Sequence, residues 1–447
     1  MQTPFLIKNA TIINEHRTFV GSVIIENEII THIFEGANNF ADCGSFIDAC
    51  GLQLVPGVID SHVHFREPGL THKGDIFTES CAAVAGGVTS FMEMPNTRPQ
   101  TITADLLEQK YDLAAEHSLA NFAFYIGATN DNLLEIKKLR PNQACAVKIF
   151  MGSSTGNMLL ENEKTLNAIF AEIPMLIAVH CEDEQIINKN MEFYKKKFGN
   201  NIPIEYHPRI RSAEACYRSS MRAAELADKY GSRLHILHLS TEGEMQIFDT
   251  NPLTDKKITA ETCVNYLWFS DKDYQYFETK IKCNPSIKSE KDREALIKSL
   301  NINKIDTIST DHAPHLWAEK QGDCLTAASG IPSVQHSLVA MMELAKRGYF
   351  AAEKVIEKMC HAPATLFGIE KRGFIREGYF ADLVLINPNS RWTVTKENIL
   401  YKCGWSPFEN TEFTNKVVVT FVNGHKVYEN GTFDERTKGK RLIFKCL

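Results

Sequence analysis

The 447-residue sequence lacks several features that would place it in other classes of protein. No apolar run approaches the roughly 18–20 residues that a helix needs to cross a bilayer. The first residues, MQTPFLIKNATIINEH, lack the charged and apolar regions of a secretory signal. The twelve cysteines include no C-x-x-C pair, and several lie inside apolar strand-like runs. We therefore expect a cytoplasmic protein with reduced thiols and no membrane segment.

Positive charge and glycine-rich nucleotide motifs are also scarce. The formal net charge is −6 at pH 7, and no stretch gathers lysine and arginine into a basic stripe, which argues against nucleic acid as the main partner. No G-x-G-x-x-G follows the first strong strand pattern, which disfavours a dinucleotide-binding sheet. What the chain does have is 44% hydrophobic and 23% charged residues, a composition typical of globular proteins.

The middle of the chain has a regular α/β pattern. Between residues 54 and 372, eight apolar strand-like runs alternate with amphipathic helical stretches. Parallel strands need crossover helices of this length, so the pattern predicts a (β/α)₈ barrel of the TIM type, with a doubly wound open sheet as the alternative. The flanking regions, residues 1–53 and 373–447, contain short strands and turns instead. We predict that both termini combine into one small β-sandwich domain.

Polar residues follow six of the predicted barrel strands. In such a barrel the chemistry lies at the carboxyl ends of the strands. The residues at these ends are His62 and His64 of VIDSHVHF, Asn96 of MEMPN, Lys148 of AVKIF, His180 of AVHCED, His238 of ILHLST, and Asp311 and His315 of STDHAPH. Their apolar flanks make each position costly for a polar group unless that group is paired or bound to a metal.

Taken singly, each of these residues has an ordinary structural explanation. His62 and His64 point to the same side of a strand, but a lone H-x-H is more often a pair of solvated histidines. His180 and His238, each by itself, would more often be hydrogen-bonded core residues. Lys148 alone would usually be a lysine whose stem is buried and whose amine reaches the surface. The functional interpretation therefore depends on the joint pattern.

The joint pattern predicts one metal centre. Imidazole and carboxylate groups are the ligand set for zinc or a related divalent ion. An ammonium group would repel a metal, so Lys148 among such ligands must be neutral or chemically changed. Reaction with CO₂ would convert it to a carbamate, an anionic group that can bridge two cations. We predict two divalent metal ions, Zn²⁺, joined by a carbamate on Lys148 and held by His62, His64, Lys148, His180, His238 and Asp311.

With these ligands assigned, the chain resembles the amidohydrolase superfamily and, within it, the dihydroorotases. The resemblance runs from IKNATIIN to ADLVLINP, and FREPG and D-H-A-P-H are its most specific parts. Dihydroorotases carry arginine at the position of Arg66, where allantoinases typically have asparagine. The resemblance implies that one metal is held by His62, His64, Lys148 and Asp311, and the other by Lys148, His180 and His238.

The resemblance also implies a substrate and a reaction. The substrate would be held at its carboxylate and ring by Arg66, Asn96, His315, Asn284, Ser329 and Gly330. The reaction would be the reversible cyclisation of N-carbamoyl-L-aspartate to (S)-dihydroorotate in de novo pyrimidine biosynthesis. Asp311 would be the catalytic base and acid. By analogy with other barrels we expect a homodimer.

Some segments depart from the family's usual pattern and keep alternatives open. FMGSSTG has Ser153 and Ser154 where many bacterial relatives carry an aspartate bridge, and the absence of an acid there supports Lys148 as the bridge. ETCVNYLW has Asn265 in place of a C-P-H-H segment, and GIPSVQHSL differs from the usual G-L-E run, so the substrate stays open. Other activities on this scaffold are an allantoinase, a dihydropyrimidinase or hydantoinase, and a deaminase. The alternative outside the enzymes is a non-catalytic homologue that supports a transcarbamoylase assembly. Such proteins usually lose metal ligands, whereas this sequence keeps all six. The polar segment 315–332 is interpreted as a loop that shapes or covers the pocket, with a surface insertion as the alternative.

Overall fold

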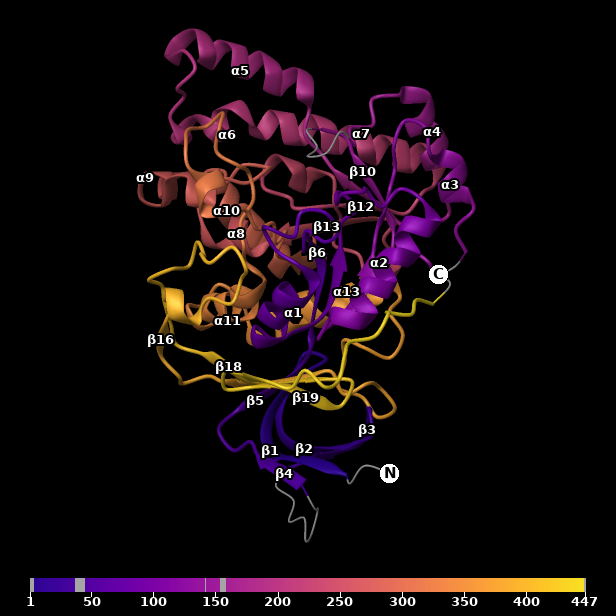
Figure 1. Cartoon of the computed structure of the whole chain (residues 1–447), viewed down its shortest axis with the longest axis vertical. Helices are drawn as coiled ribbons and strands as arrows, with labels where there is room; N and C mark the ends of the chain where they lie inside the picture. The colour runs from indigo at the N-terminus through magenta and orange to yellow at the C-terminus, as the bar shows by residue number, and fades with distance from the viewer. Residues whose placement is uncertain (1–3, 37–44, 141, 153–157, 446–447) are drawn as a thin grey trace.

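The computed structural model describes residues 4–36, 45–140, 142–152 and 158–445, and its centre is a barrel of parallel strands (Figure 1). The strands pair in the orders β6-β7-β8 and β9-β10-β11-β12-β13-β14. A parallel bridge between Val63 and His312 joins the two ends, and β8 and β9 form one barrel strand interrupted at Tyr125. The strands are β6 (Val58–Val63), β7 (Val88–Glu93), β8 (Asn121–Phe124), β9 (Ile126–Gly127), β10 (Val147–Phe150), β11 (Ile177–His180), β12 (Leu234–Ile236), β13 (Ile258–Cys263) and β14 (Thr307–Ser309). The predicted (β/α)₈ barrel is confirmed.

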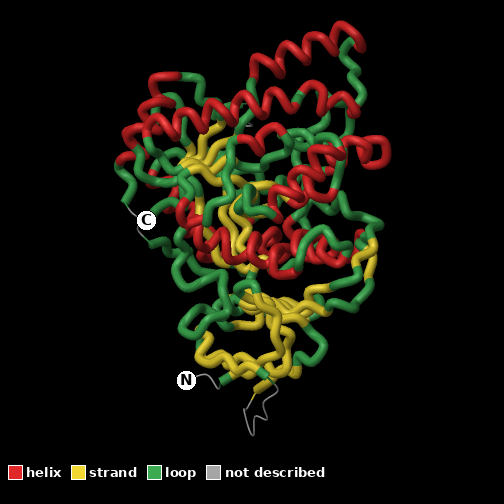
Figure 2. The backbone as a smooth tube through the Cα atoms, turned by 180° about the vertical axis from the view of Figure 1, so that it is seen from behind, coloured by secondary structure: helices red, strands yellow, loops and turns green. Residues whose placement is uncertain are grey.

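Helices surround the barrel (Figure 2). They are α1 (Ile76–Ala85), α2 (Ala104–His117), α3 (Leu133–Lys137), α4 (Glu163–Glu172), α5 (Glu184–Phe198), α6 (His207–Ile210), α7 (Ala213–Tyr230), α8 (Val264–Trp268), α9 (Tyr274–Phe277), α10 (Glu290–Asn301), α11 (Ser337–Lys346), α12 (Ala352–Ile356) and α13 (Ala362–Phe367). Local chemistry fixes their ends. The α7 helix begins after Ser212, whose hydroxyl accepts from the backbone N–H of Ala215, and ends at Gly231 with φ of 71°. None of the described helices combines the length and apolar character needed to cross a membrane.

A second sheet, built from both ends of the chain, lies against one end of the barrel (Figures 1 and 2). Its order is β20-β19-β18-β15-β5-β1-β2-β3, with β4 beside β1. Figure 2 shows it in two layers, around a core that includes Ile12, Val23 and Leu385. The strands are β1 (Phe5–Asn14), β2 (Arg17–Glu26), β3 (Ile29–Glu35), β4 (Ser45–Asp48), β5 (Gln53–Pro56), β15 (Leu383–Asn387), β18 (Lys416–Val422), β19 (His425–Glu429) and β20 (Thr432–Phe433). The predicted sandwich from both termini is confirmed.

Two segments differ from the strand prediction. The run QLVPGVIDSHVHF divides at Gly57, so that β5 pairs in the terminal sheet and β6 in the barrel. The last run, RLIFKCL, makes isolated bridges from Arg441 to Phe122 and from Phe444 to Ile369. The described part of this run therefore contacts the barrel and lies outside the terminal sheet.

A further short pair of strands, β16 (Trp392–Thr393) and β17 (Glu412–Phe413), forms a separate two-stranded sheet. The domain limits 1–53, 54–372 and 373–447 stay a prediction.

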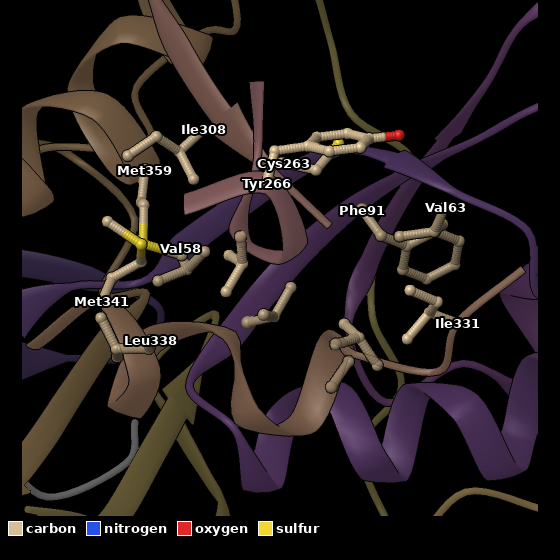
Figure 3. Close-up of a cluster of buried hydrophobic side chains, with 14 of the residues drawn as sticks. Val58, Val63, Phe91, Cys263, Tyr266, Ile308, Ile331, Leu338, Met341 and Met359 are labelled. Atoms are coloured by element: carbon tan, nitrogen blue, oxygen red, sulfur yellow. The ribbon is translucent and has the colours of Figure 1, made fainter. Parts of the chain in front are cut away.

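The barrel strands are covered on both faces, which explains their continuous apolar sequences. All six residues of β6 are buried, as expected for parallel strands with side chains inside the barrel and helices outside. Figure 3 shows Val58, Phe91 and Ile308 in an apolar cluster with Leu338 and Met341 of α11. Polar residues of these strands consequently lie in a low-dielectric interior, where they must be paired.

A buried carboxylate ties the terminal sheet to the barrel. The carboxylate of Asp382, just before β15, binds the guanidinium of Arg372, and both side chains are at most 4% exposed. The same carboxylate accepts from the backbone N–H of Asn423 at 2.8 Å and from the side-chain amide of Asn121 on β8 at 3.3 Å. One carboxylate therefore joins segments from three parts of the chain.

Replacing Asp382 with alanine is expected to reduce the free energy of unfolding by about 3–5 kcal/mol, because Arg372 would stay buried without its partner. Denaturant titration measures the change. The control is Glu412→Ala, which breaks an ion pair with Arg391 whose two side chains are 55% and 75% exposed. That change should be at most about 1 kcal/mol. Equal losses for the two variants would contradict the structural role given to Asp382.

Candidate active site

One cavity at the carboxyl ends of the barrel strands collects every residue that the sequence analysis assigned to the site. Its volume is ≈ 70 Å³. The predicted residues that line it are His62, His64, Arg66, Asn96, Lys148, His180, His238, Asn284, Asp311, His315, Ser329 and Gly330. Phe150 and Ala313 complete the wall. The structure brings these side chains together, while their individual roles stay predictions. Ser153 and Ser154 lie outside the described residues.

The backbone positions several of these side chains by unusual conformations. His62, Lys148 and His180 lie in β6, β10 and β11, as the strand pattern predicts. His238 and Asp311 instead lie two residues beyond β12 and β14, with φ of 42° and 48°. Such left-handed conformations cost about 1–3 kcal/mol for a residue other than glycine, and they cluster at functional sites.

His62, His64 and Asp311 form the first group of candidate metal ligands. Oδ1 of Asp311 lies 3.2 Å from Nε2 of His62 and 3.1 Å from Nε2 of His64. One ligand atom from each residue lies within 4.8 Å of the others. Burial acts to raise the pKa of Asp311, but the two imidazoles outweigh it and lower that pKa, so the carboxylate is ionised at neutral pH. Two imidazoles and an ionised carboxylate fit a divalent cation.

His180 and His238 form a second group beside the first. Nδ1 of His180 lies 2.8 Å from Nε2 of His238, and the rings of His238 and His62 are 5.3 Å apart. Burial, with the nearby positive groups, lowers the pKa of His238 well below its usual value, so its ring is neutral and able to bind a metal. Nδ1 of His238 is buried and has no hydrogen-bond partner among the described residues. An unpartnered buried nitrogen beside neutral imidazoles fits a metal site.

Lys148 is the buried amine between these groups. Its side chain is 1% exposed, and Nζ lies 4.6 Å from the centre of the Phe150 ring. Within the part of the chain that the structure describes, Lys148 makes no ion pair, whereas the buried Lys110 lies 2.9 Å from Glu93. Burial lowers the pKa of Lys148 to about 7, although Asp311 and Glu261 oppose it. Much of the amine is then neutral at physiological pH, which is the form that can react with CO₂.

Further polar residues lie within hydrogen-bond distance of the imidazole nitrogens of the candidate ligands. Oε1 of Glu261, on β13, lies 2.8 Å from Nδ1 of His62, and Oε2 of Glu182 lies 3.1 Å from Nε2 of His180. Oδ1 of Asn96 lies 2.8 Å from Nδ1 of His64. A carboxylate or carbonyl on the far nitrogen fixes the tautomer and orientation of a ligating imidazole. The strand pattern alone did not predict a role for Glu261 or Glu182, although an acid inside the apolar run KITAETCVN was a signal for Glu261.

Replacing Glu261 with glutamine is expected to weaken metal binding about 10- to 100-fold, because the imidazole of His62 would lose its charged partner. Metal content after dialysis against graded chelator measures the effect. The matched control is Glu244→Gln, since Glu244 is also buried and binds the hydroxyls of Ser220 and Thr241 at 2.7 and 2.8 Å, with no hydrogen bond to a candidate ligand side chain among the described residues. Unchanged metal affinity in Glu261→Gln would exclude an orienting role for this carboxylate.

The opposite end of the cavity is cationic. Nη2 of Arg66 lies 3.2 Å from Nε2 of His315 and its Nε donates to the carbonyl of Pro314 at 3.1 Å. Nζ of Lys73 lies 3.1 Å from the other nitrogen of His315 and also forms an ion pair with Oε1 of Glu319 at 2.8 Å, which offsets part of its charge. Burial and these two cations depress the pKa of His315, so the ring stays neutral. Burial lowers the pKa of Arg66 to about 10, which still leaves the guanidinium charged at neutral pH.

Gly330 allows the chain to approach this end closely. Its φ is 152°, and a Cβ atom there would lie 2.5 Å from the carbonyl oxygen of Ala313 and 2.8 Å from the His315 ring. Any other residue would displace the wall of the cavity. The carbonyl of Ser329 lies 3.1 Å from Nε2 of His315, so backbone atoms of this segment face the cationic end.

A model of the amidohydrolase family matches residues 53–427. The chain belongs to the amidohydrolase family. This amidohydrolase is 32% identical over 422 residues to a dihydroorotase from Methanosarcina acetivorans, an alignment that covers 91% of this chain and 88% of that protein. It is 30% identical over 434 residues to an allantoinase from Bacillus velezensis, with 95% and 94% covered. The resemblance to amidohydrolases and dihydroorotases that the motifs predict is confirmed.

The structure of this amidohydrolase is also similar to solved ones. The L-hydantoinase (dihydropyrimidinase) from Arthrobacter aurescens superposes with a TM-score of 0.91 at 26% identity, with 98% of this chain and 99% of that chain covered. The relatives and the structural neighbour thus carry three different enzyme names. The choice among these activities depends on the charged residues in the cavity.

Proposed function

We propose that this amidohydrolase is a dihydroorotase, which interconverts N-carbamoyl-L-aspartate and (S)-dihydroorotate in pyrimidine biosynthesis. The observation that carries the proposal is the guanidinium of Arg66. It is 6% exposed, lines the cavity, and has no carboxylate within 4.0 Å among the described residues. The guanidinium contacts His315 and the carbonyl of Pro314, and the carboxylates Asp311, Glu93 and Glu319 act on it only from beyond ion-pair distance. A buried charge without a counter-charge in direct contact is unfavourable. The carboxylate of dihydroorotate would supply that partner, whereas the uncharged rings of allantoin and dihydrouracil would leave it unpaired.

The metal centre is part of the same proposal. His62, His64 and Asp311 would hold one Zn²⁺, His180 and His238 the other, and a carbamate on Lys148 would be the shared ligand. The imidazoles, the carboxylate and the neutral amine of this chain support such a centre. When bound, the ions would polarise the amide carbonyl and make water a stronger nucleophile.

Substrate orientation would come from the cationic end. Arg66 offers two parallel N–H donors that match a carboxylate, a geometry that lysine cannot reproduce. Asn96 and His315 lie beside it in the cavity. Oδ1 of Asn284 is buried without a hydrogen-bond partner among the described residues. It would accept a hydrogen bond from a ring N–H, and the backbone of Ser329 and Gly330 would contact the rest of the ring.

Proton transfer would fall to Asp311. Ring opening adds the elements of water across the amide C–N bond, so the carbonyl carbon gains oxygen and the ring nitrogen gains a proton. The ionised carboxylate would take the proton from water and then deliver it to the departing nitrogen. Ring closure moves the same proton in the opposite direction. The low pKa of Asp311 supports its starting as a base in hydrolysis.

Turnover of dihydroorotate, allantoin and dihydrouracil by the purified, zinc-loaded protein tests the proposal. We expect kcat/KM for dihydroorotate to exceed the other two by about 10³-fold or more, because a site built to pair a buried charge rejects analogues that lack the partner. Faster turnover of allantoin or dihydrouracil would instead assign the activity of an allantoinase or a dihydropyrimidinase to this chain.

The proposed assembly is a cytoplasmic homodimer, for which light scattering should give twice the chain mass of 50.4 kDa.

A further inference from the structure

A second cavity adjoins the active site. It has a volume of ≈ 320 Å³ and shares two wall residues, Asn284 and Ser329, with the active-site cavity. We call it the side chamber. Its other walls come from α5, from α6 with the residue after it, from Lys282, and from the segment 324–329. The α5 and α6 helices lie together at the end of the molecule opposite the terminal sheet (Figure 1). The volume falls in the range of about 300–1,000 Å³ that is typical of small-molecule sites.

The side chamber has positively charged walls. Lys195, Arg211 and Lys282 line it, and no aspartate or glutamate does so among the described residues. The guanidinium of Arg211 is paired with Glu182. Lys282 is 3% exposed and donates to the carbonyl of Ala327. Neither Lys195 nor Lys282 forms an ion pair with a described residue, although Asp323 acts on Lys282 from beyond ion-pair distance, so the lining of the chamber has a net positive charge.

The three cations of the chamber differ in their exposure to solvent. Lys195 is exposed in the last turn of α5 and lies at the outer end. Arg211 and Lys282 are buried farther in. Asn284, which also faces the active-site cavity, lies two residues after Lys282. Positive charge is therefore present both on the solvent-exposed side of the chamber and in its buried part, next in sequence to a residue of the shared wall.

Hydrogen bonds anchor the segment that borders both cavities. Nζ of the buried Lys320 donates to the carbonyls of Lys282, Ala328 and Gly330 at 2.9, 2.9 and 3.0 Å. The backbone N–H of Cys324 donates to the carbonyl of Ile202 at 3.0 Å. These bonds tie the segment 320–330 to both sides of the chamber. The segment that the sequence analysis interpreted as a pocket-shaping loop thus supplies walls to both cavities.

We propose that the side chamber is an anion-binding vestibule, which attracts a small carboxylate from solvent and delivers it past Asn284 and Ser329 to the active site. The inference rests on the proposed function, because dihydroorotate and carbamoyl-aspartate are both anions. Cationic walls of low dielectric raise the local concentration of an anion and its rate of association. No bond is made or broken in the vestibule. Its loss therefore reduces kcat/KM and leaves kcat unchanged.

Two adjacent charge reversals on α5 test the vestibule. Lys195 and Lys196 are both exposed, and only Lys195 lines the chamber. We expect Lys195→Glu to lower kcat/KM for dihydroorotate about 5- to 10-fold at low ionic strength, with kcat within about twofold of the wild type. Lys196→Glu, the matched control, should lower it less than about twofold. The difference should vanish at about 0.5 M salt, where charges are screened beyond a few ångströms.

Three outcomes are separable. A selective, salt-sensitive loss in Lys195→Glu supports the vestibule. Wild-type turnover of dihydroorotate with equal kcat/KM in the two variants overturns the vestibule and leaves the proposed function intact. A wild-type enzyme that does not turn over dihydroorotate overturns the proposed function, and the vestibule as its substrate path falls with it. Lys282→Met is a second variant inside the chamber, and its kcat/KM should fall for dihydroorotate with no fall for uncharged dihydrouracil.

Discussion

Replacing Lys148 with alanine is expected to lower dihydroorotate turnover by about 10³-fold or more, a loss of at least about 4 kcal/mol of transition-state stabilisation. The same variant should retain little metal after dialysis. Both effects follow from the place of Lys148, which is buried among four histidines and Asp311 and makes no ion pair with a described residue. Alanine removes the group that is proposed as the shared ligand of the two cations. Steady-state kinetics and elemental analysis measure the two losses.

The control for this prediction is a second buried lysine. Lys110 is 1% exposed, forms an ion pair with Glu93 at 2.9 Å and does not line the active-site cavity. Lys110→Met should lower the free energy of unfolding by about 3–5 kcal/mol, because Glu93 would lose its buried partner. Its metal content should stay at the wild-type level. Full turnover by Lys148→Ala in buffer depleted of bicarbonate would exclude a carbamate bridge.

The parts of the fold that the sequence predicts are those in which local pattern and environment coincide. Barrel strands such as Val58–Val63 are buried on both faces and are apolar throughout, and helices such as Ala213–Tyr230 have a polar face and a capping serine. The division at Gly57 was not predictable, because it depends on contacts distant in sequence. A Cβ atom at Gly57 would lie 2.0 Å from Oγ1 of Thr89, and only the folded chain brings these residues together.

The candidate site was predictable to the extent that it lies at strand ends. The position of His180 follows from the strand pattern alone, since it ends β11. Glu261 was missed because it contacts His62 and lies behind the cavity surface, so its role depends on a partner 199 positions away. The side chamber was missed for a similar reason. Lys195, Arg211 and Lys282 come from helices and loops, and no periodic pattern connects them.

Replacing Arg66 with alanine is expected to lower kcat/KM for dihydroorotate about 10²- to 10⁴-fold, because the substrate carboxylate would enter a buried site without its counter-charge, at a cost of about 3–5 kcal/mol. Metal content should stay unchanged, since Arg66 contacts His315 and Pro314 and none of the candidate metal ligands. Dihydrouracil, which has no carboxylate, should be turned over no more slowly than by the wild type. The ratio of the two kcat/KM values is therefore the decisive measurement.

A charge-preserving variant separates recognition from structure at this position. Arg66 has φ of 73°, and its backbone N–H donates to Oε1 of Glu93 at 3.0 Å, a donor that alanine and lysine also have. Arg66→Lys keeps the positive charge but lacks the planar pair of N–H donors. Its kcat/KM for dihydroorotate should therefore lie between the values for the wild type and for Arg66→Ala. A structural role would instead slow dihydroorotate and dihydrouracil equally in both variants. Equal slowing would remove the observation on which the assignment to dihydroorotate depends.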